Sequence, residues 1–273
     1  MRSEVKDVSF VKSQKTKQFG QFFDLEETGF KPKMSIIIPI LQEEKLLSSV
    51  MQNYRRSVLK KYFAELIVSD GGSTDRSVEI AQKFAHKVIV HQDTRRQTIA
   101  EGRNRGAEMA RGDLFVFING DTIPSDIEKF LSYIFDWYLN SKDEIALAIK
   151  VRGFPEEENW KDKLFYFFHN NFVRFLNFIG IGMGRGECQV VRKEAFWKVG
   201  GYNPNIIAGE DFDLYRRLRR IGKIRFVDEI CVYESPRRYR KYGYLRILFH
   251  WLLNGLSVML FNKSYSTDWE PIR

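Results

Sequence analysis

The chain of 273 residues is long enough to bury a sizeable hydrophobic core, and it fits one large domain or two closely merged halves. Its 44 lysines and arginines exceed its 35 aspartates and glutamates, which gives a formal charge of +9. This balance favours a phosphate-rich partner such as a nucleotide, a nucleic acid or an anionic membrane, and charge alone does not choose among them. With only Cys188 and Cys231 present, the sequence indicates neither a disulfide framework nor a cysteine-based zinc site.

Residues 1–33 are polar and lysine-bearing, and we interpret them as an N-terminal arm. The first 20 residues contain no apolar run of the length found in signal peptides. We therefore expect the bulk of the chain to stay in the cytosol.

Short apolar runs alternate with helical periodicity from residue 34 onward. The predicted strands are SIIIPI, ELIVSD, KVIVHQ and DLFVFI. Helical spacing in residues 46–63, 75–85 and 98–112 predicts helices between them. Strands that alternate with helices imply parallel pairing in a doubly wound α/β sheet. Ligands of such sheets bind outside the carboxyl ends of the strands, so the polar residues that follow these runs are the candidates for a site.

Two predicted strands end in an aspartate beside glycine. In SDGGSTD, the glycines and hydroxyls suit a turn and a helix cap, while Asp70 would also accept the imino proton of a nucleobase. In NGDTIP, Asp121 ends the most hydrophobic strand. Because an unpaired buried carboxylate is costly, we expect Asp121 to face a cleft, accept hydrogen bonds or bind a cation, unless it lies in a surface turn. Magnesium or manganese would suit, since these ions take oxygen ligands and keep phosphate partners.

The segment GEDFDL places Glu210, Asp211 and Asp213 at the start of a predicted helix. Acidic residues there interact favourably with the helix dipole, so a capping role is one interpretation. The other is a cleft carboxylate that removes a proton from an attacking hydroxyl.

The segment YESPRRYRKYG places four cations between residues 237 and 241. Guanidinium groups bind phosphate oxygens in pairs, so this segment suits a diphosphate or a lipid phosphate. A solvated basic loop is the alternative. Pro236 and Gly243 bracket the cluster and favour a loop of defined shape.

These motifs in this order resemble glycosyltransferase family 2, the nucleotide-sugar-dependent enzymes of the GT-A fold. The resemblance extends from about residue 34 to residue 243. It is carried by PILQEE, VSDGGSTD, RNRG, NGD, GECQVVRKEAFWKVGGYN and GEDFDL.

The resemblance implies a Rossmann-like nucleotide-binding mixed sheet flanked by helices, in a GT-A catalytic domain of residues 34–235. Residues 34–122 would form its nucleotide-sugar-binding half and residues 123–235 its acceptor-binding half. The implied nucleotide-sugar-binding residues are Pro39, Glu43, Asp70, Arg103, Asn119, Gly120, Asp121, Arg237 and Arg238.

The resemblance also implies the chemistry. Asp211, with Glu210 beside it, would be catalytic, with Asp211 as the base that deprotonates the acceptor. Asp121, and by position Glu234, would bind Mn²⁺ or Mg²⁺ at the donor diphosphate. The reaction would be one in-line displacement with inversion at the anomeric carbon, in which cations stabilise the leaving nucleoside diphosphate.

Two positions depart from the family pattern. Asn119 stands where the first aspartate of the metal-binding motif usually lies, so we expect weaker metal affinity. Glu234 stands where many relatives have histidine, and it would be either an additional metal-side ligand or only an acid at a strand end.

Residues 164–182 and 244–261 are rich in phenylalanine and leucine and are close to membrane-spanning length, but they carry polar stripes. They are either core helices packed on the sheet or helices that associate with a membrane. The adjacent cations favour the membrane, and we interpret residues 236–273 as a basic loop followed by a C-terminal membrane-associated helix.

We therefore hypothesise an inverting, metal-dependent enzyme on the cytoplasmic side of a membrane, with no nucleic-acid partner. It would move mannose or glucose from a GDP- or UDP-linked donor to a lipid-linked, polyprenyl-phosphate-type acceptor. One rival is transfer to bare polyprenyl phosphate, as the dolichyl-phosphate mannose synthases do. The other is a non-catalytic basic binding protein, against which Asp121 and Asp211 both count.

Overall fold

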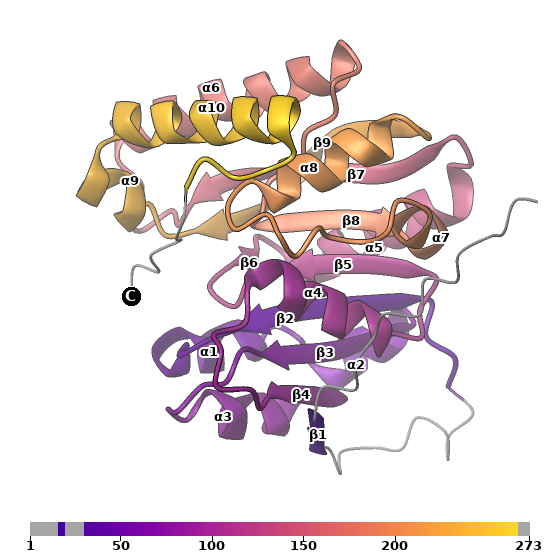
Figure 1. Cartoon of the computed structure of the whole chain (residues 1–273). Helices are drawn as coiled ribbons and strands as arrows, with labels where there is room; N and C mark the ends of the chain where they lie inside the picture. The colour runs from indigo at the N-terminus through magenta and orange to yellow at the C-terminus, as the bar shows by residue number, and fades with distance from the viewer. Residues whose placement is uncertain (1–15, 20–29, 267–273) are drawn as a thin grey trace, which may run out of the picture.

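The computed structural model describes residues 16–19 and 30–266, which form a mixed β-sheet with helices on both faces (Figure 1). The strands are β1 (Thr16–Phe19), β2 (Met34–Ile40), β3 (Ala64–Asp70), β4 (Lys87–His91), β5 (Leu114–Ile118), β6 (Ile123–Pro124), β7 (Glu144–Gly153), β8 (Cys188–Arg192) and β9 (Lys223–Glu234). The helices are α1 (Glu44–Met51), α2 (Arg56–Lys61), α3 (Ser77–Phe84), α4 (Ile99–Glu108), α5 (Ile127–Asn140), α6 (Trp160–Phe178), α7 (Lys193–Lys198), α8 (Glu210–Arg219), α9 (Arg237–Tyr242) and α10 (Tyr244–Phe261).

The strand order is β1-β4-β3-β2-β5-β8-β7-β9-β6. Strands β4, β3, β2 and β5 are parallel, as the alternation of strands and helices predicts. Beyond β5 the sheet is mixed, because β8 pairs antiparallel with both β5 and β7 while β7 and β9 are parallel. The β5–β8 pairing joins the two predicted halves of the catalytic domain in one sheet.

Successive residues of β2 face opposite layers of the protein. Ile36 and Ile38 belong to a hydrophobic cluster with residues of α1 and α5, and Ile37 belongs to a second cluster with residues of α4 and α8. Both faces of the sheet are therefore buried, which explains why the strands read as continuous apolar runs.

Helix α4 lies unusually close to β2. A Cβ atom at Gly106 would lie 2.3 Å from Cγ2 of Ile37, so any larger residue would displace the helix. The helix begins with a reciprocal capping box between Thr98 and Glu101. The distance of α4 from β2 and the conformation of its first turn are thus both fixed, and together they position Arg103.

Three segments differ from their predictions. Residues 46–63 form α1 and α2 instead of one helix, because the chain turns around the buried Tyr54. The basic segment predicted as a loop is instead the short helix α9. Pro236 is its N-cap and Gly243, at φ +84°, ends it, so the residues that bracket the cluster mark the ends of a helix.

Four residues of the predicted arm form β1, which pairs antiparallel with β4 at the sheet edge, and residues 1–15 and 20–29 of the arm lie outside the described residues. Cys188 and Cys231 are free thiols, as predicted.

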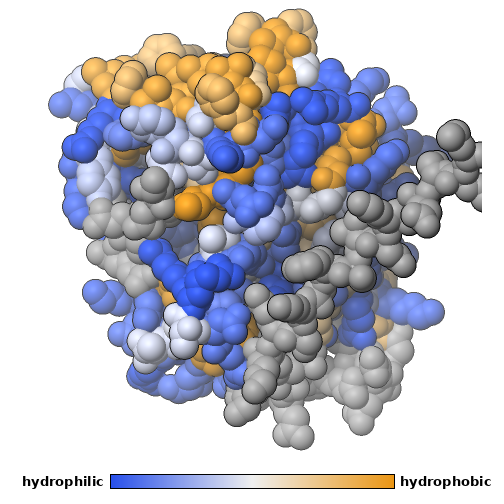
Figure 2. All heavy atoms as spheres, viewed as in Figure 1, coloured by the Kyte–Doolittle hydropathy of each residue, from blue (hydrophilic) through white to orange (hydrophobic). Residues whose placement is uncertain are grey.

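Helices α6 and α10 lie side by side at one end of the molecule (Figure 1). They are in contact through Trp251, whose ring centroid lies 4.8 Å from that of His169 and 6.1 Å from that of Phe165. Figure 2 shows apolar side chains gathered at the exposed edge formed by these helices. Within residues 16–19 and 30–266, α10 alone has the length and mean hydropathy of a helix that can cross a membrane, and 17% of it is buried.

Candidate active site

One cavity of about 1230 Å³ extends from the carboxyl ends of β2 and β5 to the space between α6 and α10. It brings together most of the residues that the sequence singles out. Those lining it are Pro39, Glu43, Arg103, Asn119, Gly120, Asp121, Glu210, Asp211, Glu234, Arg237 and Arg238. Asp70 is the one predicted site residue that does not line it.

Asp70 is fully buried in the turn that follows β3. Its Oδ2 accepts hydrogen bonds from the backbone N–H groups of Gly72 and Ser73, at 2.9 and 2.8 Å, and its Oδ1 accepts one from the Ser73 hydroxyl at 2.5 Å. The carboxylate therefore shapes its own turn. Contact between Asp70 and a nucleobase stays a prediction.

Gln42 ties the turn after β2 to the turn after β3. Its Oε1 accepts hydrogen bonds from the backbone N–H groups of Thr74 and Asp75, and its Nε2 donates to the Thr74 hydroxyl at 2.8 Å. Its own N–H donates to the Ser73 hydroxyl at 2.8 Å. These bonds hold the backbone of Gln42 at φ +57°, a conformation that non-glycine residues rarely adopt, and they hold the two turns together.

Arg103 connects the two halves of the site from a position that is 1% exposed. Its guanidinium donates to Glu210 at 2.8 Å, to the Asn119 side-chain oxygen at 3.0 Å and to the Gly186 carbonyl at 2.6 Å. It also lies over the Tyr202 ring, 5.1 Å from its centroid. Arg103 thus holds the end of β5, the loop before β8 and the start of α8 around one cation.

Asp121 follows β5 and reaches into the cavity. Its side chain accepts a hydrogen bond from the Thr122 hydroxyl, at 3.4 Å. Enclosure by the surrounding protein and the negative charge of Glu187 raise the pKa of Asp121, against the effect of the Arg238 cation. Beside it, Gly120 is needed for packing, because a Cβ atom there would lie 2.9 Å from Cγ2 of Ile40.

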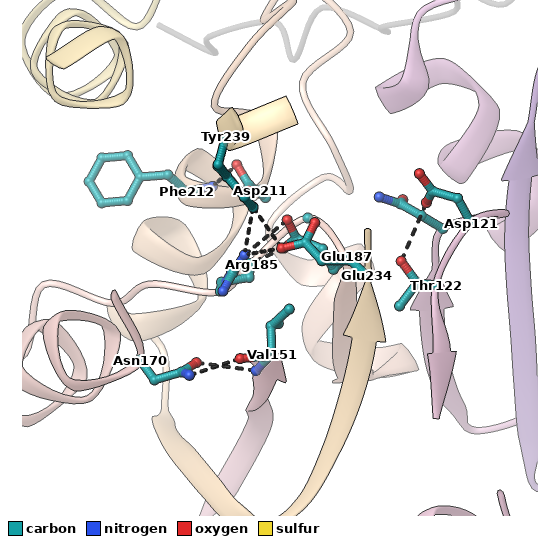
Figure 3. A network of polar contacts seen from close by, with 12 residues as sticks. Asp121, Thr122, Val151, Asn170, Arg185, Glu187, Asp211, Phe212, Glu234 and Tyr239 are labelled. Carbon is teal, nitrogen blue, oxygen red and sulfur yellow. Dashed lines mark hydrogen bonds and ion pairs between the residues drawn. The ribbon is translucent and has the colours of Figure 1, made fainter. Parts of the chain in front are cut away.

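A second buried cation, Arg185, lies at the wall of the cavity and was not identified from the sequence. Its guanidinium donates to both carboxylate oxygens of Glu187 at 3.1 Å, to Glu234 at 2.8 Å and to the Tyr239 hydroxyl at 3.3 Å. The Tyr239 hydroxyl in turn donates to Glu234 at 2.6 Å. Figure 3 shows Glu187 and Glu234 converging on Arg185.

The pKa values of the two carboxylates in this cluster are shifted in opposite directions. Burial and the negative charge of Glu187 raise the pKa of Glu234 well above its usual range. Burial also acts to raise the pKa of Glu187, but the Arg185 cation outweighs it and lowers that pKa. Glu234 is thus paired with Arg185 and Tyr239 in this structure, and its role, either as an additional metal-side ligand or as an acid at a strand end, stays a prediction.

Asp211 and Glu210 begin α8 but differ in their surroundings. Glu210 is buried against Arg103, whereas Asp211 is half-buried at the cavity and accepts the Phe212 N–H at 2.8 Å. Burial and the negative charge of Glu210 raise the pKa of Asp211 to about 7. A carboxylate with this pKa is suited to accept a proton near neutral pH.

The cations of α9 have different surroundings. Arg237 and Arg238 line the cavity, and Nε of Arg237 donates to the Ser235 hydroxyl at 2.9 Å. Arg240 is instead paired with Asp162 at the start of α6. The Tyr244 hydroxyl donates to the same carboxylate at 2.5 Å. Arg240 and Tyr244 thus anchor α9 and α10 to α6.

The loop before Asp211 is held by α10 and the residues that follow it. The Ser264 hydroxyl accepts the N–H groups of Ile207 and Ala208, at 2.8 and 3.1 Å. Gly209, at φ +88°, lies against Val258, since a Cβ atom there would be 3.5 Å from its Cγ2. The loop before Asp211 and α10 therefore form one packed unit.

The described residues contain no group of three or more histidines, cysteines, aspartates or glutamates arranged to hold a metal ion. Asp121 is the acid that reaches into the cavity near the paired Glu187 and Glu234. A single carboxylate fits Mg²⁺ or Mn²⁺ that arrives with a diphosphate, because such ions are held by one or two carboxylates and otherwise by phosphate and water.

The comparisons with known proteins agree with this geometry. The sequence model described as Glycosyl transferase family 2 matches residues 35–200. The PGL/p-HBAD biosynthesis glycosyltransferase of Mycobacterium bovis (strain BCG / Pasteur 1173P2) is 35% identical over 94 residues, which cover 33% of this chain and 36% of that protein. The match thus spans about a third of the length of this relative.

Two further similarities cover most of the chain. The succinoglycan biosynthesis protein ExoA of Rhizobium meliloti (strain 1021) is 27% identical over 248 residues, which cover 82% of this chain and 73% of that protein. The mannosyltransferase PcManGT from Pyrobaculum calidifontis, solved in complex with GDP-Man and Mn²⁺, has a TM-score of 0.60 at 16% identity, over 83% of this chain and 62% of that one. This structural likeness confirms the predicted GT-A fold.

Proposed function

The chain belongs to glycosyl transferase family 2, and we propose that it transfers a hexose, mannose or glucose, from a nucleotide sugar to a lipid-linked acceptor at a membrane, with inversion. One observation carries this proposal. A single cavity contains Asp121, Asp211 and the apolar space between α6 and α10. Donor, base and apolar acceptor would therefore meet in one place.

The nucleotide would lie at the ends of β2 and β3, between Pro39, Glu43 and the paired turns. A smaller cavity of about 380 Å³ adjoins these turns and is lined by Gly71, Gly72, Arg95 and Arg96, among others. Its arginines and open backbone suit the polar edge of a base or a ribose. GDP- and UDP-linked donors both fit this description.

The diphosphate would lie beside Asp121, with Arg237 and Arg238 on the same cavity wall. Mg²⁺ or Mn²⁺, when bound by Asp121, would supply positive charge to the leaving diphosphate. The two arginines would also stabilise the leaving diphosphate, because their guanidinium groups would lie next to the oxygens on which negative charge accumulates. The related mannosyltransferase PcManGT was solved with Mn²⁺, which supports a divalent cation here.

Asp211 would remove the proton from the acceptor hydroxyl as that oxygen attacks the anomeric carbon. Its raised pKa makes it a stronger base than an exposed aspartate and leaves it substantially ionised at neutral pH. Arg103 keeps Glu210 paired next to it, so Glu210 would position α8 and hold Asp211 without taking the proton itself.

The acceptor would approach from the membrane. Apolar side chains are exposed on both α6 and α10, including Phe167, Phe175, Phe249 and Phe261. An apolar surface of this kind beside the cations of α9 suits a headgroup interface of an anionic membrane. The active site would then face the cytoplasmic leaflet.

The test is transfer from radiolabelled GDP-mannose and UDP-glucose, with Mn²⁺, to two acceptors presented in vesicles: a glycosylated polyprenyl diphosphate and bare polyprenyl phosphate. Product on the glycosylated lipid supports the proposal. Product on bare polyprenyl phosphate alone would instead identify the simpler transferase. If the protein neither transfers sugar nor hydrolyses the donor in a metal-dependent way, and Asp211→Ala changes neither result, the protein is a non-catalytic binding protein.

A further inference from the structure

Helices α6 and α10 carry two sets of apolar side chains: one set lines the groove between the helices, and the other does not. On α6, every fourth residue faces the cavity: Leu164, Phe168, Phe172 and Leu176. On α10, the cavity-lining residues also follow helical spacing: Leu245, Leu248, Trp251, Leu252, Gly255, Leu256 and Met259. Phe167, Phe175 and Phe249 are exposed but do not line the cavity. Residues of the inner stripes are also partly exposed, Phe168 at 61% and Leu252 at 54%, so the two sets differ in whether they line the cavity and not in exposure.

The volume of the cavity exceeds the need of one ligand. Small-molecule sites enclose about 300–1,000 Å³, whereas this cavity measures about 1230 Å³. The donor accounts for the polar end. The apolar end, between the two helices, has room for a second molecule.

Gly255 marks the point where the groove meets the catalytic acids. It lies within α10, where glycine is unfavourable for the helix. A Cβ atom there would meet one neighbouring atom within 4 Å, Cε1 of Phe212, at 4.0 Å. Phe212 follows Asp211 directly, and its ring extends away from Asp211 (Figure 3), so the missing side chain leaves open space beside the Phe212 ring.

The charge at the polar end specifies what the groove holds. Lys161, in the first turn of α6, lines the same cavity as the apolar stripes, whereas Arg237 and Arg238 are assigned to the donor diphosphate and Arg185 is paired with Glu187 and Glu234. A cation at one end of an apolar groove complements a phosphate at the end of a hydrocarbon chain. A purely apolar ligand would not require it.

We propose that the α6–α10 groove binds the aliphatic chain of the acceptor, which passes Gly255 and places its phosphate-linked head beside Asp211. This inference rests on the proposed function for the identity of the chain as acceptor. It adds that the protein itself encloses part of that chain, so recognition would extend beyond the headgroup. Acceptors with longer chains would then bind more tightly until the groove is filled.

A binding experiment tests the groove without turnover. The probe is dodecyl phosphate with bromine atoms on its chain, which quench nearby tryptophan. The protein carries Trp160→Phe, because Trp160 also lines the cavity, so that Trp251 reports on the groove. We expect saturable quenching that disappears in the additional variant Trp251→Phe, and a Kd at least fivefold higher in Gly255→Leu. The control Phe249→Ala changes an outward side chain and should leave the Kd unchanged.

The same variants are then compared in transfer. Gly255→Leu should raise KM for a long-chain acceptor about tenfold and leave KM for a four-carbon analogue unchanged, with circular dichroism confirming that α10 is intact. The proposed groove would be refuted if Gly255→Leu and its parent bound dodecyl phosphate with equal Kd values. It would also be refuted if Phe249→Ala raised the Kd as much as Gly255→Leu does. Quenching without any sugar transfer would retain the groove and refute the proposed function instead.

Discussion

The Arg103 guanidinium donates a hydrogen bond to Glu210 at 2.8 Å, and both side chains are buried between the two halves of the sheet. Removing one partner of a buried pair leaves an uncompensated charge, which typically costs about 3–5 kcal/mol. Glu210→Ala should therefore lower the free energy of unfolding by about this amount in urea denaturation. Arg103→Met combined with Glu210→Ala should recover much of the loss. If Glu210→Ala left stability unchanged, the pair would not hold the halves together.

The pH dependence of transfer should report Asp211. A base acts in its deprotonated form, and the pKa of Asp211 is raised to about 7. As pH falls below about 7, kcat/KM should decrease tenfold per unit, and above it kcat/KM should level off. Asp211→Asn should reduce kcat by about 10²–10⁴-fold. Glu210→Gln removes a negative charge that raises the pKa of Asp211, so it should move the profile to lower pH and keep the tenfold decrease per unit. A profile that lost its pH dependence in Glu210→Gln would instead assign the proton to Glu210.

The roles of Asn119 and Asp121 can be separated by nucleotide binding. Asp121→Ala should abolish transfer and remove the increase in nucleoside diphosphate affinity that Mn²⁺ produces in titration calorimetry. Asn119→Asp should be tolerated, because Arg103 already donates to the oxygen at this position. Transfer that survives in Asp121→Ala would remove the metal from the mechanism.

Arg185 should control how stability depends on pH. In Arg185→Met, Glu187 and Glu234 lose their cation, so both folded-state pKa values would lie above the unfolded values. A raised pKa contributes stability at low pH that is lost as pH rises through it. The stability difference from the natural protein should therefore be larger at pH 8 than at pH 5, as measured by urea denaturation. An equal difference at both values would mean that the cluster is not buried.

Vesicle sedimentation tests the outer apolar surface. Replacing Phe167, Phe175 and Phe249 with serine should reduce binding to anionic vesicles at least tenfold, because burying each side chain in the interface contributes roughly 1.5–3 kcal/mol at most. Fluorescence quenching in the groove should be retained. Undiminished vesicle binding would place the membrane contact elsewhere.

Local motifs predicted the strands and the main acids well. SIIIPI and DLFVFI are buried on both faces, and the ends of these strands carry the polar residues that reach the cavity. The signals were local, because strand, turn and helix start are each encoded within a few residues. The structure brings Asp121 and Asp211 to one cavity, as the order of the motifs predicted.

Long-range pairing explains what the sequence did not reveal. Arg185 lies in a glycine-bearing turn just before the GECQVV segment and matches no motif, and its partners Glu234 and Tyr239 are about 50 residues away. Charged residues flanking glycine before a strand were the available signal. For Asp70 the opposite holds: the glycines and Ser73 of its own motif already account for its three hydrogen bonds.

The bonds from Ser264 to the loop before Asp211 give α10 a mechanical role. The helix whose outer face is suited to rest on lipid is the same helix whose end fixes the backbone next to the base. On the proposed function, the height of Asp211 above the bilayer would be set by the protein as a rigid distance, and an acceptor whose head protrudes by a different length would meet the sugar out of line.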